Sequence, residues 1–262
     1  MSPSTITVDR QGPVVRLALD RPDRLNALDP TMLDELLDVL AGLAADQDVQ
    51  GLVLTSAGRV FSAGVDLDSP FFMENVPNEG DFTGKRLLDH QHRVIQALYE
   101  LPFPTVAGVN GDAVGGGGFG LAMACDVRVA VRGARFWMVP GELAVVQDFG
   151  LSWLVQKQIG PSRTLHMALL GAPVVAETGL GWGLVNEVVE PAELSGRLDE
   201  ITAQLAAAGP DAARMLKLVV RNGAQSTLRD QLGLEAVANG LAFRSAEFAD
   251  RKATYLDRLR GR

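Results

Sequence analysis

Cysteine, histidine and tyrosine are scarce in this chain of 262 residues, and long hydrophobic runs are missing. The single Cys125 permits no internal disulfide, which favours a reducing compartment and predicts a cytoplasmic protein. His90 and His92 stand at i and i+2 of an expected helix and so face different ways, while His166 is isolated. All three are predicted to be structural, and no metal is expected. No stretch approaches the roughly 20 apolar residues of a membrane span, so no membrane contact is expected either.

Basic residues are also few relative to acidic ones. The chain has 24 Lys and Arg against 32 Asp and Glu, a net charge of −8. Nucleic-acid binding requires a basic face, so no nucleic-acid partner is expected. Hydrophobic residues at 47% and charged residues at 21% are ordinary for a soluble globular protein, and the length fits one large domain, alone or with an appendage.

Glycine, in contrast, is concentrated in one stretch, PTVAGVNGDAVGGGGFGLAMACD from Pro104 to Asp126. Thr105 to Val109 reads as a buried strand, and Asn110-Gly111 ends it. Four glycines, Gly115 to Gly118, then lead into an apolar helical run. The first N–H groups of a helix have no partner within it, and its dipole favours negative charge there. This stretch predicts a site for an anion, or for a negative charge that develops during a reaction.

A second glycine turn, Phe61 to Asp66, follows another apolar run from Gly51 to Thr55. Two separate backbone N–H donors could form an oxyanion hole. The rival interpretation, a nucleotide-phosphate site, is weak because neither G-x-G-x-x-G with a downstream acid nor G-K-[ST] occurs.

With these motifs in place, the chain resembles the crotonase superfamily, the enoyl-CoA hydratases and isomerases. The resemblance rests on F-S-A-G-V-D, on V-N-G-D-A-V-G-G-G-G, on Asn26-Ala27-Leu28 after Arg21-Pro22, and on Gly183-Leu184-Val185, and it runs from about Val14 to Leu256. It implies an α/β fold: a spiral of ββα units over residues 1–195, which holds the acyl-CoA site. It also implies a helical region over residues 196–262 that associates with other copies in a homotrimer or a dimer of trimers.

The residues themselves predict several element boundaries. Two strands, 5–8 and 14–19, flank the Gln11-Gly12 turn, and Asp29-Pro30 is typical of a helix N-terminus. Helices are expected over 85–99, 151–159 and 163–170, with Gly160-Pro161 separating the last two. After Pro191 only helices are expected, over 194–208, 210–222, 228–243 and 246–259.

The resemblance also implies site residues. The two oxyanion donors fall on the amides of Val65 and of Gly117 or Gly116. The chain has one extra residue between Asn110 and Asp126, so counting back from Asp126 gives Gly117 and counting forward from Asn110 gives Gly116. Gly117 is preferred because a loop accommodates an insertion more easily than a helix does. Coenzyme A, which is part of the substrate rather than a separate cofactor, would contact Arg24, Ala27, Ala63, Asp66 and Leu67. Phe71, Phe72 and Trp153 would line the acyl pocket.

Both glutamates that the family's hydratases use to activate water are missing, since Gly120 (or Phe119) and Pro140 stand in their places. Glu142 lies two residues out of register as a possible second acid. Asp148 stands where family members that move a carbon–carbon double bond have aspartate. An alternative role for Asp148 is to cap the helix that begins near Gly150.

We therefore expect an enoyl-CoA isomerase in which Asp148 moves a proton, because one carboxylate is sufficient for that reaction. Two alternatives stay open. The first is a hydratase that relies on Glu142 or Asp148 alone. The second is a non-catalytic acyl-CoA-binding member in which Asp148 serves only as a helix cap.

Overall fold

The computed structural model describes residues 4–69, 83–139, 143 and 145–260. Its centre is a six-stranded sheet in the order β1-β2-β3-β4-β6-β9, in which only the β1–β2 pair is antiparallel. A three-stranded sheet, β5-β7-β8, lies beside it. The strands are β1 (Ile6–Gln11), β2 (Val14–Leu19), β3 (Gly51–Ser56), β4 (Thr105–Val109), β5 (Ala113–Val114), β6 (Val127–Val131), β7 (Arg135–Trp137), β8 (Val174–Val175) and β9 (Glu187–Val189).

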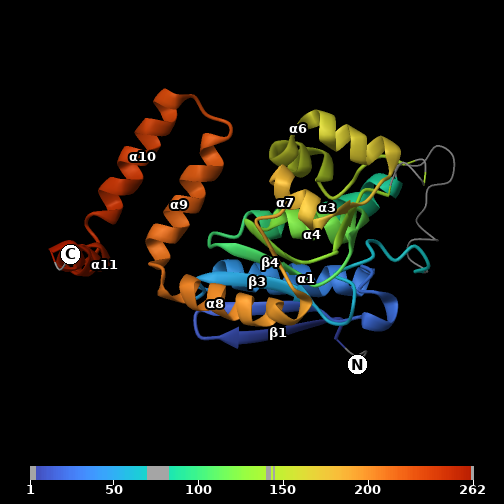
Figure 1. The fold of residues 1–262 in the computed structure, drawn as a ribbon, viewed down its shortest axis with the longest axis horizontal. Helices are drawn as coiled ribbons and strands as arrows, with labels where there is room; N and C mark the ends of the chain where they lie inside the picture. The colour runs from blue at the N-terminus through green and yellow to red at the C-terminus, as the bar shows by residue number, and fades with distance from the viewer. Residues whose placement is uncertain (1–3, 70–82, 140–142, 144, 261–262) are drawn as a thin grey trace.

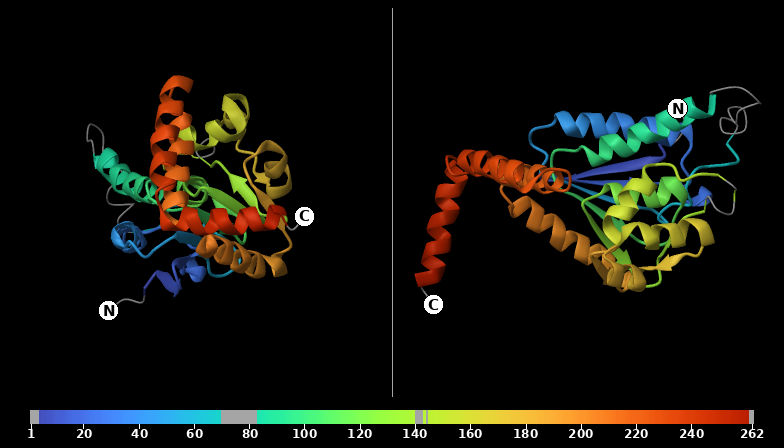
Figure 2. Two further views of the ribbon diagram at one scale, coloured as in Figure 1. Left: turned by 90° about the vertical axis from the view of Figure 1, so that its left-hand side faces the viewer. Right: turned by 90° about the horizontal axis from the view of Figure 1, so that it is seen from above.

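Helices cover the large sheet on both faces, so its central strands are almost wholly buried, as in other parallel sheets. Figure 2 (right) shows α1 and α3 on one face and α8 on the other. The helices are η1 (Pro22–Arg24), α1 (Pro30–Ala45), α3 (Thr83–Tyr99), α4 (Gly115–Ala124), α6 (Leu151–Leu170), α7 (Ala176–Trp182), η2 (Pro191–Glu193), α8 (Leu194–Ala207), α9 (Pro210–Gly223), α10 (Leu228–Ala242) and α11 (Ala246–Arg260).

Local sequence signals account for several of these boundaries. The Asp29 side chain accepts a hydrogen bond from Met32 N at 2.9 Å, and Pro30 opens α1, which confirms the predicted N-terminus. Gly160 has non-helical angles inside α6 (φ 79°, ψ 163°), so the helix is interrupted where Gly160-Pro161 predicted a break.

The first of the C-terminal helices, α8, packs on the sheet. Helix α8 packs on β2, β3 and β6 through buried residues that include Leu198 and Ile201, so it belongs to the core. Helix α8 therefore packs with the sheet, and the domain boundary at residues 195/196 stays a prediction. From Pro210 onward, α9, α10 and α11 project away from the sheet, as Figure 1 shows.

Candidate active site

Four loops meet at one edge of the large sheet because each follows the carboxyl end of a parallel strand. The loop after β2 holds residues 21–28, the loop after β3 holds 61–67, and the loop after β4 leads into α4. The segment after β6 and β7 leads to Asp148. Since β2, β3, β4 and β6 are neighbours in the sheet, their carboxyl ends bring these loops together, at the edge where open α/β sheets bind ligands.

The glycine-rich stretch forms the N-terminus of α4. Gly115 takes a left-handed φ of 62°, which turns the chain from β5 into the helix. Val114 is the N-cap and makes no side-chain cap hydrogen bond. The N–H groups of Gly115, Gly116 and Gly117 therefore have no acceptor within the helix, and the helix dipole adds partial positive charge there.

The turn containing Val65 packs directly against this helix N-terminus. Val114 N donates to Ser62 O at 2.9 Å. A Cβ on Gly117 would lie 3.0 Å from the carbonyl carbon of Gly64, the atom bonded to Val65 N. The absence of a side chain at Gly117 thus allows the two turns to touch.

The backbone N–H of Val65 points away from Leu28, the residue with which Val65 forms a β-bridge. Leu28 N donates to Gly64 O at 2.7 Å, and Asp66 N donates to Leu28 O at 2.9 Å. In this parallel bridge between Leu28 and Val65, the Val65 N–H points to the other side. Within the described part of the chain no acceptor is found for it, so this N–H is available to a ligand.

The two candidate glycines differ in their surroundings. Gly117 faces Gly64 and Leu28, whereas a Cβ on Gly116 would lie 1.8 Å from Asp148 Oδ1. This arrangement favours Gly117 as the partner of Val65, and it assigns Gly116 the task of making room for the carboxyl group. The pairing of Val65 with Gly117 as oxyanion donors stays a prediction.

The predicted coenzyme A contacts come from the two segments that meet at the Leu28–Val65 bridge. Ala63 N donates to Leu25 O at 3.0 Å, which places Ala63 beside the loop that contains Arg24 and Ala27. Arg24 is exposed, and Leu67 is 43% exposed. The structure thus brings these residues together at one rim; their contacts with coenzyme A stay predictions.

Asp148 lies over the start of α4 because of a tight turn. Buried Phe149 has a φ of 47°, which is unusual for a residue with a side chain, and Gly150 follows with a φ of 69°. This turn places Asp148 Oδ1 in the space left by the missing side chain of Gly116. Strained backbone of this kind is frequent at functional sites.

The capping alternative for Asp148 is wrong. Gly150 is the N-cap of α6, and Leu151 N donates to the backbone carbonyl of Asp148 at 3.0 Å rather than to its carboxyl group. Burial raises the pKa of the Asp148 carboxyl, although its own N–H and nearby His92 partly oppose that effect. A base whose pKa lies closer to neutrality transfers protons more readily in both directions.

His92 was missed as part of the site. Its ring packs edge-on against Phe149, with 6.5 Å between ring centroids, and its charge when protonated acts on Asp148. The i, i+2 spacing of His90 and His92 showed only that they face different ways. Finding His92 beside Asp148 required knowing that α3 packs on α4 and that α4 packs on α6.

The structure shows why α4 carries no catalytic glutamate. A Cβ on Gly120 would lie 2.8 Å from the Cβ of Phe149 and 3.1 Å from its carbonyl oxygen. Phe149 therefore fills the space that a longer side chain at position 120 would need. Glu142, Phe71 and Phe72 lie outside the described residues, so their predicted roles stay untested.

Trp153 and Cys125 have very different surroundings. Trp153 is 37% exposed and packs on Tyr99 and under the Lys157 ammonium; its place in the acyl pocket stays a prediction. Cys125 is buried, which raises the pKa of its thiol to about 12 and keeps it protonated. Across the described ranges, no cluster of three or more His, Cys, Asp or Glu side chains could hold a metal ion, and no helix there is long and apolar enough to cross a membrane.

Comparisons with known proteins show which family the chain belongs to. Residues 9–260 match the family model described as enoyl-CoA hydratase/isomerase. The 1,2-epoxyphenylacetyl-CoA isomerase of Escherichia coli is 32% identical over 93% of this chain and 92% of its own length. A 4-chlorobenzoyl coenzyme A dehalogenase of Arthrobacter is 33% identical over 85% of this chain and 80% of its own. The crystal structure of an enoyl-CoA hydratase from Bacillus anthracis superposes with a TM-score of 0.89 and 27% identity, covering 97% of this chain and 96% of that one. The chain therefore belongs to the enoyl-CoA hydratase/isomerase family of enzymes, the crotonase superfamily that its sequence motifs indicated.

Proposed function

We propose that this enzyme moves a double bond in an acyl-CoA thioester, with Asp148 as the acid and base. One observation carries the proposal: the Asp148 carboxyl group, with its pKa raised by burial, lies against Gly116 at the start of α4. Asp148 removes a proton near the double bond, and the resulting negative charge rests on the thioester oxygen between the amides of Val65 and Gly117. The same carboxyl group then returns the proton to another carbon.

The packing of Gly120 supports isomerisation over hydration. Family hydratases use two glutamates, and the space next to Gly120 is filled by Phe149. A hydratase built on this chain would have to activate water with Asp148 alone, or with Glu142.

A second reaction is favoured by His92. A carboxylate can also act as a nucleophile, and a neighbouring imidazole can activate the water that hydrolyses the resulting ester. The charge of protonated His92 lowers the pKa of Asp148. The Arthrobacter relative is named as a 4-chlorobenzoyl coenzyme A dehalogenase. In that case Asp148 would displace halide from an aromatic ring, and water would release the hydroxylated product.

Incubation with a panel of 2-enoyl-, 3-enoyl-, epoxide-bearing and halogenated aromatic CoA thioesters distinguishes these reactions. We expect a product of unchanged mass in which NMR shows a moved double bond. A gain of water would indicate a hydratase, and halide release a dehalogenase. Binding of thioesters without turnover would contradict all three assignments.

We also propose that the chain associates with further copies of itself, as a trimer or a dimer of trimers. Support comes from α10 and α11, which carry exposed apolar side chains and project from the core (Figure 1). Exposed apolar area of this kind is typical of interaction surfaces.

A further inference from the structure

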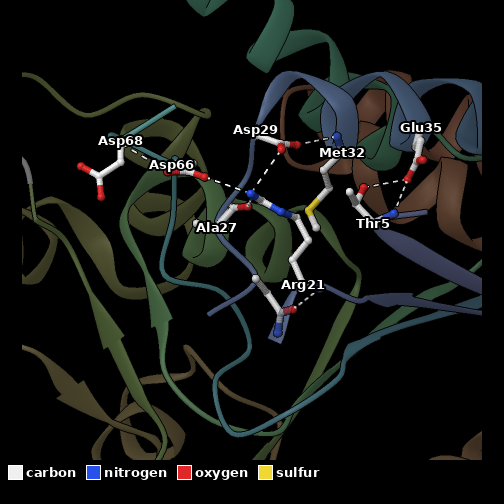
Figure 3. Close-up of polar contacts among 9 residues, drawn as sticks. Thr5, Arg21, Ala27, Asp29, Met32, Glu35, Asp66 and Asp68 are labelled. Carbon is white, nitrogen blue, oxygen red and sulfur yellow. Dashed lines mark hydrogen bonds and ion pairs between the residues drawn. The ribbon is translucent and has the colours of Figure 1, made fainter. Parts of the chain in front are cut away.

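Arg21 joins the two segments that form the rim of the site. Its guanidinium donates to Ala27 O at 2.5 Å and to Asp66 Oδ2 at 3.1 Å, and it lies 3.3 Å from Asp29 Oδ2. Figure 3 shows the side chain reaching between Asp29 and Asp66. The Arg21 side chain is only 18% exposed, so these contacts are largely shielded from water.

These contacts flank the bridge that orients the Val65 amide. Ala27 precedes Leu28, and Asp66 follows Val65, while Leu28 and Val65 form the bridge itself. The guanidinium therefore ties together the two chain segments whose pairing directs the Val65 N–H. A shift of either segment would turn that N–H.

The loop that Arg21 holds is strained. Leu25 and Asn26 both have a φ of 53°, although neither is glycine, and such conformations persist only where the surroundings impose them. The buried Asn26 side chain accepts from Arg21 N at 2.8 Å and donates to the carbonyls of Ala57 and Val60. Arg21 thus acts on this loop through its backbone as well as its guanidinium.

We propose that Arg21 is a positioning residue that keeps the Val65 amide aimed at the thioester oxygen, an inference that rests on the proposed oxyanion role of Val65. A guanidinium suits this task because its planar fork offers several donors in fixed directions, whereas an ammonium is a single point charge. The charge is needed too. Without it, Asp29 and Asp66 would repel each other and separate the two segments.

The effect of losing Arg21 should fall on the transition state. A misdirected amide still allows the thioester to bind, but it fails the oxygen when negative charge develops there. We expect Arg21→Lys to lower kcat by about 10- to 100-fold, as a small misplacement of catalytic groups does, while KM changes much less.

A spectroscopic probe separates positioning from general stability. The CoA thioester of 4-(dimethylamino)cinnamic acid absorbs at longer wavelength when its carbonyl oxygen accepts strong hydrogen bonds. The wild type should shift this absorption on binding, and Arg21→Lys should lose most of the shift while keeping similar affinity and a similar melting temperature. The matched control is Arg16→Lys. Arg16 is also 18% exposed and pairs with Asp199 at 2.7 Å, but it lies on β2 away from the rim.

The possible results are distinct. If the wild type binds the probe without any shift, the oxyanion hole itself is wrong. If the wild type and Arg21→Lys show the same shift and the same kcat, Val65 is oriented without Arg21 and the inference is overturned. If Arg21→Lys does not fold, Asp29→Asn replaces it, because asparagine keeps the cap on α1 but removes the charge that faces Arg21. A partial loss of the shift is then expected, and an unchanged shift would overturn the inference.

Discussion

Among single residues, two glycines of α4 determine which side chains can pack against the start of that helix. The missing side chain of Gly116 leaves the space that Asp148 occupies, and the missing side chain of Gly120 leaves the space that Phe149 occupies. The carboxyl group thus arrives from the turn before α6 instead of from α4. In the proposed reaction, these two glycines, one helical turn apart, determine both the number and the origin of the catalytic carboxylates.

Asp148→Asn tests the catalytic role directly. The amide keeps the shape of the side chain but cannot accept or return a proton, so we expect turnover to fall by roughly 100- to 10,000-fold. Burial penalises the ionised carboxyl group, so the variant should also unfold at a higher temperature than the wild type at neutral pH. Asp199→Asn, which changes an exposed aspartate, should alter neither property. Near wild-type turnover by folded Asp148→Asn would exclude Asp148 as the base.

The pH dependence of activity identifies the same group. As a base Asp148 must be ionised, so kcat/KM should rise with pH through its pKa, which burial raises above the ordinary value of 3.8. Stability should follow the opposite sign: relative to Asp148→Asn, the wild type loses stability as pH rises through that pKa, because the buried charge then forms.

His92→Gln is the matched test of this assignment. Protonated His92 favours the charged carboxylate, so its removal should move the acid limb of kcat/KM to higher pH. A limb that stays in place in His92→Gln would show that a different group controls it.

Among the elements, those that follow local rules could be predicted from the sequence. Three features depend only on residues that are neighbours in the sequence. They are the start of α1 at Asp29-Pro30, the interruption of α6 at Gly160-Pro161, and the strand, turn and helix around the glycines. The sequence also predicted that the two glycine turns lie together, but this prediction came only from the resemblance to the family's motifs.

Contacts between distant elements could not be predicted in the same way. The position of His92 depends on how α3 packs beside α4, and the assignment of α8 to the core depends on its packing against the sheet. The turn at Phe149 needs a left-handed φ at a residue whose type does not favour it. Because this turn could not be predicted, the sequence could not show that Gly150, and not Asp148, is the N-cap of α6.

Asp126 is one of the core groups that hold α9, beside the backbone carbonyls of Val49 and Phe103, which accept hydrogen bonds from Arg214 and Lys217. Asp126 lies 2.8 Å from Lys217 Nζ and 2.5 Å from Arg221 Nη2, and the Lys217 side chain is only 8% exposed. Asp126→Asn would leave these cations without a partner charge, so we expect a loss of about 3 kcal/mol in the free energy of unfolding. Proteolysis should also cleave more readily between α8 and α10. Asp257→Asn, at an exposed ion pair, is the control; equal stability of the two variants would contradict this anchoring role.

On the scale of the whole molecule, the core and the C-terminal helices differ in how exposed their apolar side chains are. The core contains one cluster of buried apolar side chains, which includes leucines, valines and phenylalanines. In α9, α10 and α11 no apolar residue is buried, and several large apolar side chains of these helices and of the residue after α10 are exposed: Leu216, Leu218, Val220, Leu228, Leu232, Val237, Leu241, Phe243, Phe248, Tyr255 and Leu259. Figure 2 shows these helices extending away from the core. A surface of this kind is stable in water when another copy of the chain covers it.

Val237 and Leu241 of α10 offer a test of that association, since they are 63% and 57% exposed and lie four residues apart on one helix face. In the proposed trimer, two aspartates at these positions would place charges in an apolar interface, which is costly without partners. We expect light scattering at micromolar concentration to give three or six chains for the wild type and one chain for Val237→Asp/Leu241→Asp. As a control, Val8→Asp changes a 50% exposed residue on β1, the edge strand of the large sheet, and should leave the mass of the assembly unchanged. A monomeric wild type with ordered C-terminal helices would contradict self-association, because the exposed apolar face would then be stable without a second copy.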